Sequence, residues 1–392
     1  MEDQIMDTAV LDAPVAPPPV KPVKPVQPPT AQRRHHLPAL TGLRFFLAVW
    51  VILHHLTGKG MMLEPFVQTF PPAIGHLIRG GYLAVGTFFV LSGFVLARSY
   101  GQKPWNRGRL VRYGIARMAR VYPGYLLSLL IVSPWIYHYL FEAPADPSHK
   151  AAIMADYGFV LQGWTGSLGV GWNTPAWSLS CELFFYLCFP VLLMWFGRRT
   201  PIRLGIAAGI AVMLPVVLSQ FHVPWSWKPL HHTADFLAGI VASHVYDMLV
   251  ESNWSFVRRI GLWTYGFAGS VGALIVAFQG SVKGVLDLNS ALRPVNFLVL
   301  IGLAIGGGLP ARFLSTRPIK YLGQASYSMY ILHVPLLWWY TRYLWHTTTI
   351  ASQTAAAALY IAGVIVVSAL AFQFVEEPAN RYIREWGTAR KS

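Results

Sequence analysis

Arg44 and His55 lie in the first long apolar run of the chain, and their side chains could bind an anion and move a proton. The run predicts a membrane-spanning helix, in which an arginine costs about 2.5 kcal/mol or more and therefore normally has a function and a polar partner. The spacing of eleven residues returns His55 to nearly the same helix face as Arg44, roughly 16 Å further along the axis. A guanidinium and a titratable imidazole therefore line one side of one helix.

The composition places this helix among many others. The chain has 392 residues, of which 54% are hydrophobic and only 12% are charged, whereas soluble domains carry about 25% charged residues. Many apolar runs approach the ~20 residues that a helix needs to cross a bilayer. We therefore expect an all-α fold, a polytopic membrane helix bundle. The formal net charge of +15 is spread over many short loops, so we expect no nucleic-acid partner.

The apolar runs predict about ten transmembrane helices. They cover residues 38–57, 82–98, 122–140, 176–196, 202–219, 234–250, 261–279, 295–310, 326–345 and 353–375. With the N-terminus inside, most Lys and Arg residues fall on the inner side, in agreement with the positive-inside rule. We therefore expect both termini to be cytoplasmic.

Three regions are expected along the chain. Residues 1–36 are rich in proline and are predicted to form a disordered tail, and their polar start predicts no cleavable signal peptide. Residues 37–380 are expected to form the transmembrane domain. Residues 381–392 are expected to form a short basic C-terminal tail.

The expected orientation gives each polar residue inside the membrane a depth. Arg44 is predicted near the inner third of its span and His55 near the outer third. The span that contains Glu182 runs inward and begins just before this residue, so Glu182 is expected at a depth similar to that of His55. Glu376 follows the last span on the inner side. The polar set therefore extends over most of the membrane depth.

The first inner loop is unusually basic. Topology alone requires one or two basic residues there, but the loop holds Lys103, Arg107, Arg109, Arg112, Arg117 and Arg120. Such a cluster could bind lipid headgroups or the phosphates of a cytoplasmic nucleotide-like cofactor. Composition leaves both alternatives open.

Cysteine and histidine pairs give little support to a metal or redox site. Cys181 and Cys188 are seven residues apart in one apolar segment, which is too far for a disulfide within a helix, and we expect them to fill the core. The pair His231–His232 near Asp235 could bind a metal, but polar residues of the outer surface are the favoured interpretation. We therefore expect no metal.

Several motifs together resemble the membrane-bound acyltransferase 3 family, whose members acylate cell-envelope carbohydrates and some small molecules. The motifs are, in chain order, Gly-Leu-Arg44 with His55, Thr87-Phe-Phe-Val-Leu-Ser-Gly-Phe94, Arg117-Met-Ala-Arg120-Val-Tyr-Pro123, Trp177-Ser-Leu-Ser-Cys-Glu182, Ser326-Tyr-Ser-Met-Tyr-Ile-Leu-His333, and Phe374-Val-Glu376-Glu-Pro378. Each motif alone is weak, but their order and their positions on segments of the expected orientation make the resemblance strong.

Two features differ from the pattern of this family. Many members have a second acidic residue directly after the first glutamate, where this chain has Leu183, so a role for a second carboxylate is not supported. The optional extracellular hydrolase-like domain of the family is also not expected, because only the short basic tail follows Arg381. The membrane unit is therefore expected to act alone or with a partner protein.

The resemblance implies that acyl-CoA is the donor and a sugar hydroxyl the acceptor, with no bound cofactor. Acyl-CoA is cytoplasmic, whereas envelope glycans are often completed outside, so the bundle must present the acyl group across the membrane. Arg44, Arg117, Arg120 and Tyr122 are the expected acyl-CoA-binding residues. Guanidinium groups suit phosphate because they bind it with two hydrogen bonds.

His55 and Glu182 are the expected catalytic residues. A neutral imidazole titrates near the working pH and can remove the proton of an attacking hydroxyl. Glu182 could orient this imidazole and stabilise the imidazolium, as a carboxylate does in a hydrolase triad. His55 could instead carry the acyl group transiently, and the sequence does not separate the two mechanisms.

A further set of residues is expected to line the substrate pocket. It comprises Trp177, Ser178, Ser180, Tyr327, His333 and Glu376. We expect His333 to be structural or pocket-lining rather than a second base, and the two serines to pack helices rather than to act as nucleophiles. Trp172 and Trp177 could form part of a sugar-binding platform.

The resulting hypothesis is an O-acetyltransferase of the bacterial inner membrane. Its expected acceptor is an exopolysaccharide, an O-antigen or a lipid-linked oligosaccharide. Membrane lipids are expected partners, and the polysaccharide-synthesis machinery is a candidate partner. A small-molecule glycoside or macrolide is the alternative acceptor. A transporter or flippase is the alternative from another class, but such proteins often contain two related halves, and we find no internal repeat.

Overall fold

The described part of the chain is helical. The computed structural model describes residues 37–101, 104–169, 171–196, 200–252, 254–278, 288–345 and 349–389, and these ranges contain no strand. The expected disordered tail, residues 1–36, lies outside the described residues, as do the last three residues of the expected C-terminal tail. Residues 381–389 belong to a helix.

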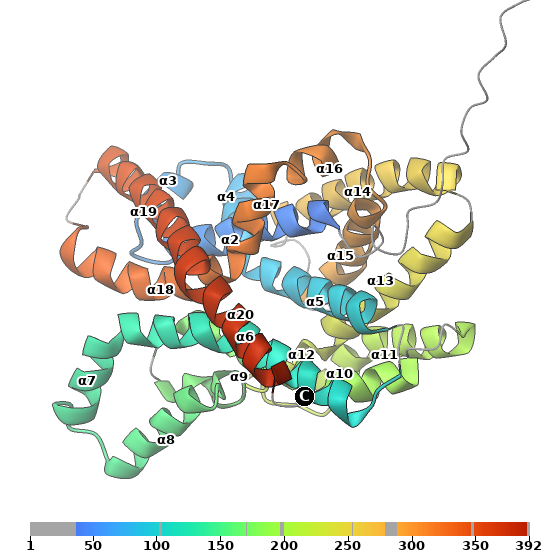
Figure 1. The fold of residues 1–392 in the computed structure, drawn as a ribbon. Helices are drawn as coiled ribbons and strands as arrows, with labels where there is room; N and C mark the ends of the chain where they lie inside the picture. Colours follow the sequence, from blue (N-terminus) through green and yellow to red (C-terminus); the bar gives the residue numbers. More distant parts are fainter. Residues whose placement is uncertain are drawn as a thin grey trace, which may run out of the picture.

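Long helices form the body of the molecule (Figure 1). They are α2 (Pro38–Leu56), α5 (Ala84–Tyr100), α6 (Arg107–Ile131), α10 (Trp177–Phe196), α11 (Pro201–Gln220), α13 (Thr233–Ser252), α14 (Trp254–Ala277), α15 (Leu288–Ile305), α18 (Ser326–Tyr343) and α19 (Ile350–Ala371). Shorter helices lie between and after them. They are α3 (Glu64–Val67), α4 (Pro72–Arg79), α7 (Ser133–Phe141), α8 (Pro147–Gly158), α9 (Gln162–Thr165), α12 (Lys228–His231), α16 (Gly308–Leu314), α17 (Arg317–Gln324) and α20 (Glu377–Ala389). A π-helical turn, Phe372–Glu376, joins α19 to α20.

All ten predicted segments are largely helical, although residues 122–140 are divided between α6 and α7, and fewer than ten are long and apolar enough to span a membrane. Six stretches of the described chain meet that criterion, and a seventh is added if α6 and α7, which are bent by 63°, form one broken span. The helices α13, α14 and α18 do not meet it. Buried polar residues such as Asp235 in α13 and His333 in α18 lower the mean hydropathy of two of these helices.

The outer surface of the bundle is apolar, as expected for helices that face lipid. Only 17% of the most apolar stretch of α11 is buried, and its Ile202 is 76% exposed. Similarly, only 28% of the most apolar stretch in Ile350–Gly387 is buried, and Leu359 of α19 is 67% exposed. Large apolar side chains at such exposure suit a hydrocarbon environment better than water.

The helices α5 and α13 are in backbone contact at the centre of the bundle. A Cβ atom at Gly93 would lie 2.1 Å from the carbonyl oxygen of Phe236, and one at Gly239 would lie 2.0 Å from that of Val90. No side chain fits at either glycine, and this is how small residues allow membrane helices to approach closely. At the far end of the pair, Arg98 of α5 donates to Asp247 of α13 at 2.5 Å.

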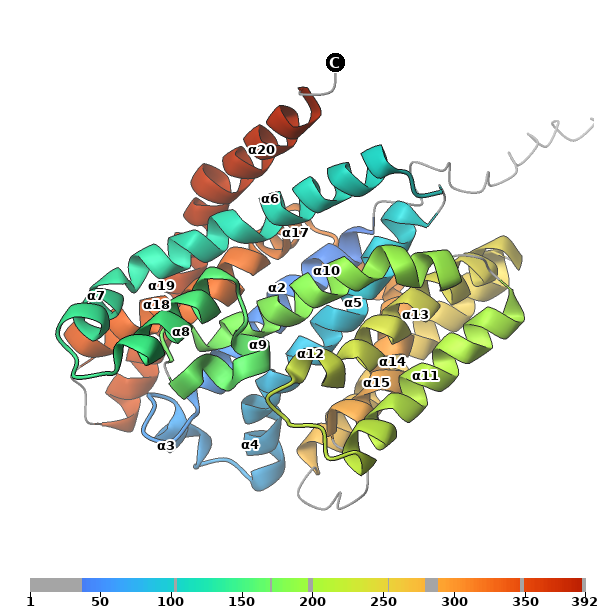
Figure 2. The same ribbon diagram turned by 90° about the horizontal axis from the view of Figure 1, so that it is seen from below.

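Two halves of the bundle can be distinguished along α2. In Figure 2 the axes of α2, α5, α6 and α10 run side by side. The 3-10 turn Gly80–Leu83, which leads into α5, lies against the second half of α2, since a Cβ atom at Gly81 would meet the carbonyl oxygen of Trp50. We call this the histidine half, because α2 ends there with His55. The opposite half contains Arg44, the start of α18 and the contact between α6 and α20, and we call it the arginine half.

Candidate active site

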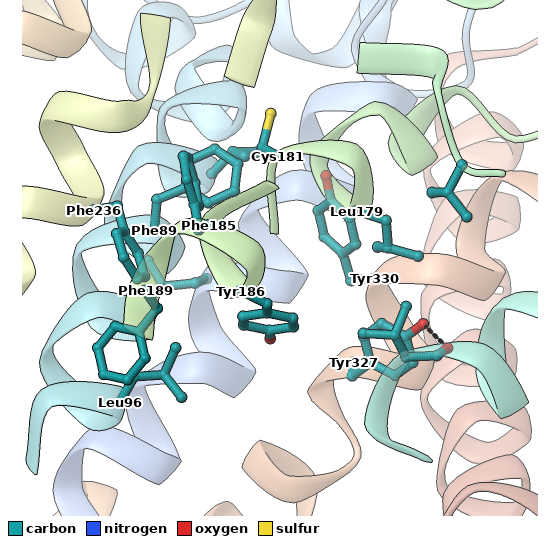
Figure 3. Close-up of a cluster of buried hydrophobic side chains, with 14 of the residues drawn as sticks. Phe89, Leu96, Leu179, Cys181, Phe185, Tyr186, Phe189, Phe236, Tyr327 and Tyr330 are labelled. Carbon is teal, nitrogen blue, oxygen red and sulfur yellow. Dashed lines mark hydrogen bonds between the residues drawn. The ribbon is translucent and has the colours of Figure 1, made fainter. Parts of the chain in front are cut away.

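A small cavity in the centre of the bundle brings four of the expected site residues together. It has a volume of about 40 Å³ and is lined by α2, α5, α10 and the start of α18. Its lining residues are Arg44, Val85, Phe88, Phe89, Ser178, Leu179, Glu182, Ser326, Tyr327 and Tyr330. Figure 3 shows the tyrosines Tyr186, Tyr327 and Tyr330 to one side of a group of packed phenylalanines. We call the cavity lined by these helices the Arg44 cavity.

Arg44 has unused hydrogen-bonding capacity inside this cavity. Its Nε atom is buried and has no hydrogen-bond partner among the described residues. Glu182 lines the same cavity and accepts a hydrogen bond from the Tyr186 hydroxyl at 3.2 Å. A guanidinium inside a membrane normally has a polar partner, so the unpaired Nε–H favours a role in binding an anionic or carbonyl group.

Arg120 differs from Arg44 because its charge is already paired. Its guanidinium forms an ion pair with Glu376, whose side chain is 2% exposed. The second carboxylate oxygen of Glu376 accepts a hydrogen bond from the Ser328 hydroxyl at 2.7 Å. The π-helical turn Phe372–Glu376 carries this glutamate, and such turns are frequent at functional sites.

Arg117 and Tyr122, the other two expected acyl-CoA-binding residues, lie on α6. The guanidinium of Arg117 lies 5.6 Å from the ring centroid of Tyr186 and 5.9 Å from that of Tyr113, and its buried Nε has no hydrogen-bond partner among the described residues. Tyr122 is half-buried against the hydrophobic core. Unpaired donors are therefore found on Arg44 and Arg117.

A second space in the arginine half lies between α6 and α20. It has a volume of about 450 Å³ and is lined by Arg120, Phe372, Glu376, Glu377, Asn380, Arg381, Arg384 and Glu385. The helix α20 packs along α6 at this point. Arg381 and Arg384, which were expected to lie in a tail, therefore lie on a helix beside the Arg120–Glu376 pair.

His55 forms a pair with His333 in the histidine half. The Nδ1 atom of His55 lies 3.0 Å from the carbonyl oxygen of Val51 and 3.3 Å from Nε2 of His333. The Nδ1 atom of His333 lies 2.7 Å from the carbonyl oxygen of Tyr330, and His333 is 0% exposed. The two rings are 4.8 Å apart in an edge-on arrangement.

These distances determine the tautomer of both histidines. A carbonyl oxygen can only accept, so Nδ1 of His333 carries the proton and Nε2 of a neutral His333 is an acceptor. The Nδ1 atom of His55 therefore faces two acceptors and must be the donor. The remaining nitrogen of His55, Nε2, keeps a free lone pair. The geometry thus provides one basic nitrogen whose orientation is fixed by its ring partner.

Glu182 is not the partner of His55 that the sequence suggested. The carboxylate lies in the Arg44 cavity and bonds to Tyr186, while the ring of His55 contacts His333. Depth along a span says nothing about which helix lies next to it, and α18 rather than α10 supplies the neighbour of His55. The signal available in the sequence was that the spans with His55 and His333 both run outward and carry their histidines well along the span.

The serines of α10 are occupied by structural hydrogen bonds. Ser178 lines the Arg44 cavity, but its hydroxyl donates to the carbonyl oxygen of Pro175 at 3.0 Å. The Ser180 hydroxyl donates to the carbonyl oxygen of Val160 at 2.6 Å and accepts from the amide of Gly163 at 2.9 Å. Their expected role in helix packing agrees with these contacts, and Ser180 does not line the cavity.

The two tryptophans considered as a sugar platform are both covered. Trp172 is 4% exposed and its ring lies 5.0 Å from that of Tyr157. Trp177 stacks on His232, with 5.4 Å between ring centroids, and the Lys228 ammonium lies 4.2 Å from the Trp177 ring. Burial lowers the pKa of Lys228, which lies in the short helix α12. Neither indole presents an open face of the kind expected.

Comparison with known proteins decides the class of this site. A family model described as an acyltransferase domain matches residues 37–372. The chain belongs to the acyltransferase 3 family. It is therefore an O-acyltransferase, and the transporter alternative is not supported.

Relatives of known name agree with this assignment. The chain is 29% identical over 390 residues to acyltransferase MdmB of Streptomyces mycarofaciens, covering 88% of this chain and 92% of MdmB. It is 24% identical over 383 residues to the peptidoglycan O-acetyltransferase OatA of Listeria monocytogenes, covering 90% of this chain and 57% of OatA. The O-acetyltransferase OatA of Staphylococcus aureus is 22% identical over 373 residues, again with 57% of OatA covered. No solved structure matches the chain.

Proposed function

We propose that this membrane protein transfers an acyl group, and first of all an acetyl group, from acyl-CoA to a hydroxyl of an envelope or exported carbohydrate. The observation that carries the proposal is α2 itself, which places an unpaired guanidinium nitrogen and a free imidazole nitrogen on one helix face. The name of the Listeria relative, a peptidoglycan O-acetyltransferase, supports the acetyl group and an envelope glycan as acceptor.

The proposed topology follows the positive-inside rule. The ten predicted segments cross the bacterial inner membrane, and both termini are cytoplasmic. The arginine half then faces the cytoplasm, where acyl-CoA is found, and the histidine half faces outward. This orientation agrees with the arginines of α6, which all lie between Arg107 and Arg120.

Arg44, Arg117, Arg120 and Tyr122 bind acyl-CoA in this proposal. The space between α6 and α20 admits the phosphates beside Arg120, and the unpaired nitrogens of Arg117 and Arg44 continue the cationic path inward. Glu182 holds the guanidinium of Arg44 within the cavity by charge attraction and so positions it. Tyr327 and Tyr330 form the cavity wall on the way to His333.

His55 performs the proton transfer. Its Nε2 atom takes the proton of the acceptor hydroxyl as the oxygen attacks the thioester carbonyl, and the imidazolium returns that proton to the departing thiolate of CoA. His333 accepts the hydrogen bond from Nδ1 and stabilises the imidazolium, as a carboxylate does in a triad. The same Nε2 atom could carry the acyl group transiently, and acid quenching of the enzyme with radiolabelled acetyl-CoA distinguishes this second mechanism by a labelled protein.

The test is CoA release by the purified protein in lipid nanodiscs. Acetyl-, propionyl- and succinyl-CoA are supplied with and without envelope glycans, and glycan products are identified by mass spectrometry. We expect CoA release with acetyl-CoA and a glycan that gains an acetyl group. A small-molecule glycoside or macrolide is included as the alternative acceptor. No CoA release with any donor and acceptor would contradict the proposal.

A further inference from the structure

A polar cavity that the proposed reaction does not use lies in the histidine half. It has a volume of about 300 Å³, at the lower end of the range for ligand pockets. The end of α11, the loop to α12 and the starts of α13 and α15 form its walls. Trp225 lies on its rim, 57% exposed, with its ring 4.6 Å from that of His231.

A buried network forms the floor of this cavity. Asp235 accepts from Nε of Arg293 at 2.7 Å with one oxygen and contacts Nδ1 of His232 at 2.9 Å with the other. The three residues are between 1% and 8% exposed. Arg293 also donates to the carbonyl oxygen of Ala211 at 3.1 Å and to the Ser290 hydroxyl at 3.4 Å. Since a guanidinium has five N–H donors, two remain for a ligand.

The charge of this network argues for a neutral ligand. The carboxylate of Asp235 is balanced by the guanidinium of Arg293. Because both oxygens of Asp235 are already used and a guanidinium is adjacent, the site repels a metal cation. An anion would meet the same carboxylate. The remaining donors and acceptors, including the side chain of Asn289, suit the hydroxyls of a polyol.

A thin aromatic wall separates this cavity from the Arg44 cavity. The ring of His232 lies 4.9 Å from that of Phe89, and Phe89 lines the Arg44 cavity. On α5, Gly86 faces the second cavity, since a Cβ atom there would lie 3.7 Å from Asp235 and 3.6 Å from Asn289. The second cavity therefore lies across α5 from the central cavity, in the half of the bundle that contains His55.

We propose that the Trp225–Asp235–Arg293 cavity binds a neutral sugar ring of the acceptor. The inference rests on the proposed function, which requires a carbohydrate near His55. Trp225 offers an apolar face at the rim, and the buried network offers hydrogen bonds to hydroxyls. A site with such fixed polar groups discriminates strongly against ligands that lack the matching hydroxyl, because its own groups would then remain unpaired.

Binding is tested directly by saturation-transfer difference NMR on the protein in nanodiscs. The probes are the methyl glycosides of glucose, galactose, rhamnose and N-acetylglucosamine. Trp225→Ala and Asn289→Ala alter the cavity at residues outside the buried triad and so should leave the fold intact. Trp227→Ala is the matched control, because this tryptophan lies on the same loop but does not line the cavity. Thermal unfolding of each variant checks the fold.

We expect a signal for at least one glycoside, a loss of affinity of about tenfold in both cavity variants, and no change in Trp227→Ala. With the identified acceptor, Trp225→Ala should raise the acceptor KM by the same factor at nearly constant kcat. Absence of a signal for every glycoside, or equal signals in wild type and both cavity variants, would overturn the proposal. Sugar binding is measured in the absence of acyl-CoA, so it tests the cavity alone. A failure to release CoA would contradict the proposed function, whatever the result of the binding experiment.

Discussion

The arginine half and the histidine half of the bundle use their polar residues in opposite ways. In the arginine half, Arg44 and Arg117 keep buried N–H groups without a partner among the described residues. In the histidine half, Nδ1 of His55 and both nitrogens of His333 have defined partners, so Nε2 of His55 alone is uncommitted in the pair. Guanidinium groups with unused N–H donors suit the binding of a large anion, and a single oriented lone pair suits proton transfer. The comparison predicts different kinetic losses from substitutions in the two halves.

The largest effect is expected for His55→Ala. Removal of a general base lowers turnover by about 10²–10⁴-fold. The measurement is CoA release with saturating acetyl-CoA and acceptor, together with acetyl-CoA affinity, which should change little. His54→Ala is the matched control, since its ring bonds to the carbonyl oxygen of Arg79 instead of to His333. Near-normal turnover of His55→Ala would contradict the proposal that the histidine half carries out proton transfer.

Arg120→Met tests whether this arginine is a structural partner or a free binding group. The substitution leaves the Glu376 carboxylate buried without its counter-ion, which costs about 3–5 kcal/mol of stability. The double variant Arg120→Met/Glu376→Gln removes both charges and should recover most of the loss. Thermal unfolding in nanodiscs measures both. Equal unfolding temperatures of the single and double variants would show that the pair does not carry this energy.

Arg44→Ala should act mainly on the affinity for acyl-CoA. Loss of charge-assisted hydrogen bonds to the donor raises the KM for acetyl-CoA by about 10–100-fold, with a smaller change in kcat. Arg44→Lys should lie between wild type and Arg44→Ala, because an ammonium keeps the charge but loses the planar pair of donors. A fall in kcat at constant KM would show that Arg44 acts in the chemical step, and the two halves would then not differ in function.

The smallest effect is expected for His333→Leu. The substitution removes one hydrogen bond that orients His55 and stabilises its imidazolium, which is worth about 1.4 kcal/mol or tenfold in kcat. The KM for acetyl-CoA should stay constant. His333→Gln retains an acceptor and should recover part of the turnover. Equal kcat values for the leucine and glutamine variants would argue that His333 only fills space.

The sequence predicted the elements better than the contacts between them. All ten expected segments are helical, because apolar runs of that length have few other ways to satisfy their backbone in a membrane. The alignment of Arg44 and His55 follows from helical periodicity, and both lie on α2 as expected. The pairing of His55 with His333 instead of Glu182 could not be predicted, because lateral neighbours depend on how helices pack and not on depth. The bend between α6 and α7 similarly depends on the surrounding bundle.

The backbone contact between α5 and α13 has a mechanical consequence. The close contacts of Gly93 with Phe236 and of Gly239 with Val90 leave no room for either helix to rotate or slide past the other, so we expect the pair to move as one unit. The helix α5 supplies Phe88 and Phe89 to the Arg44 cavity, and α13 supplies Asp235 to the cavity below Trp225. Movements that enlarge one cavity must come from its remaining walls. The α5–α13 pair is therefore a wall of fixed position that the two cavities share.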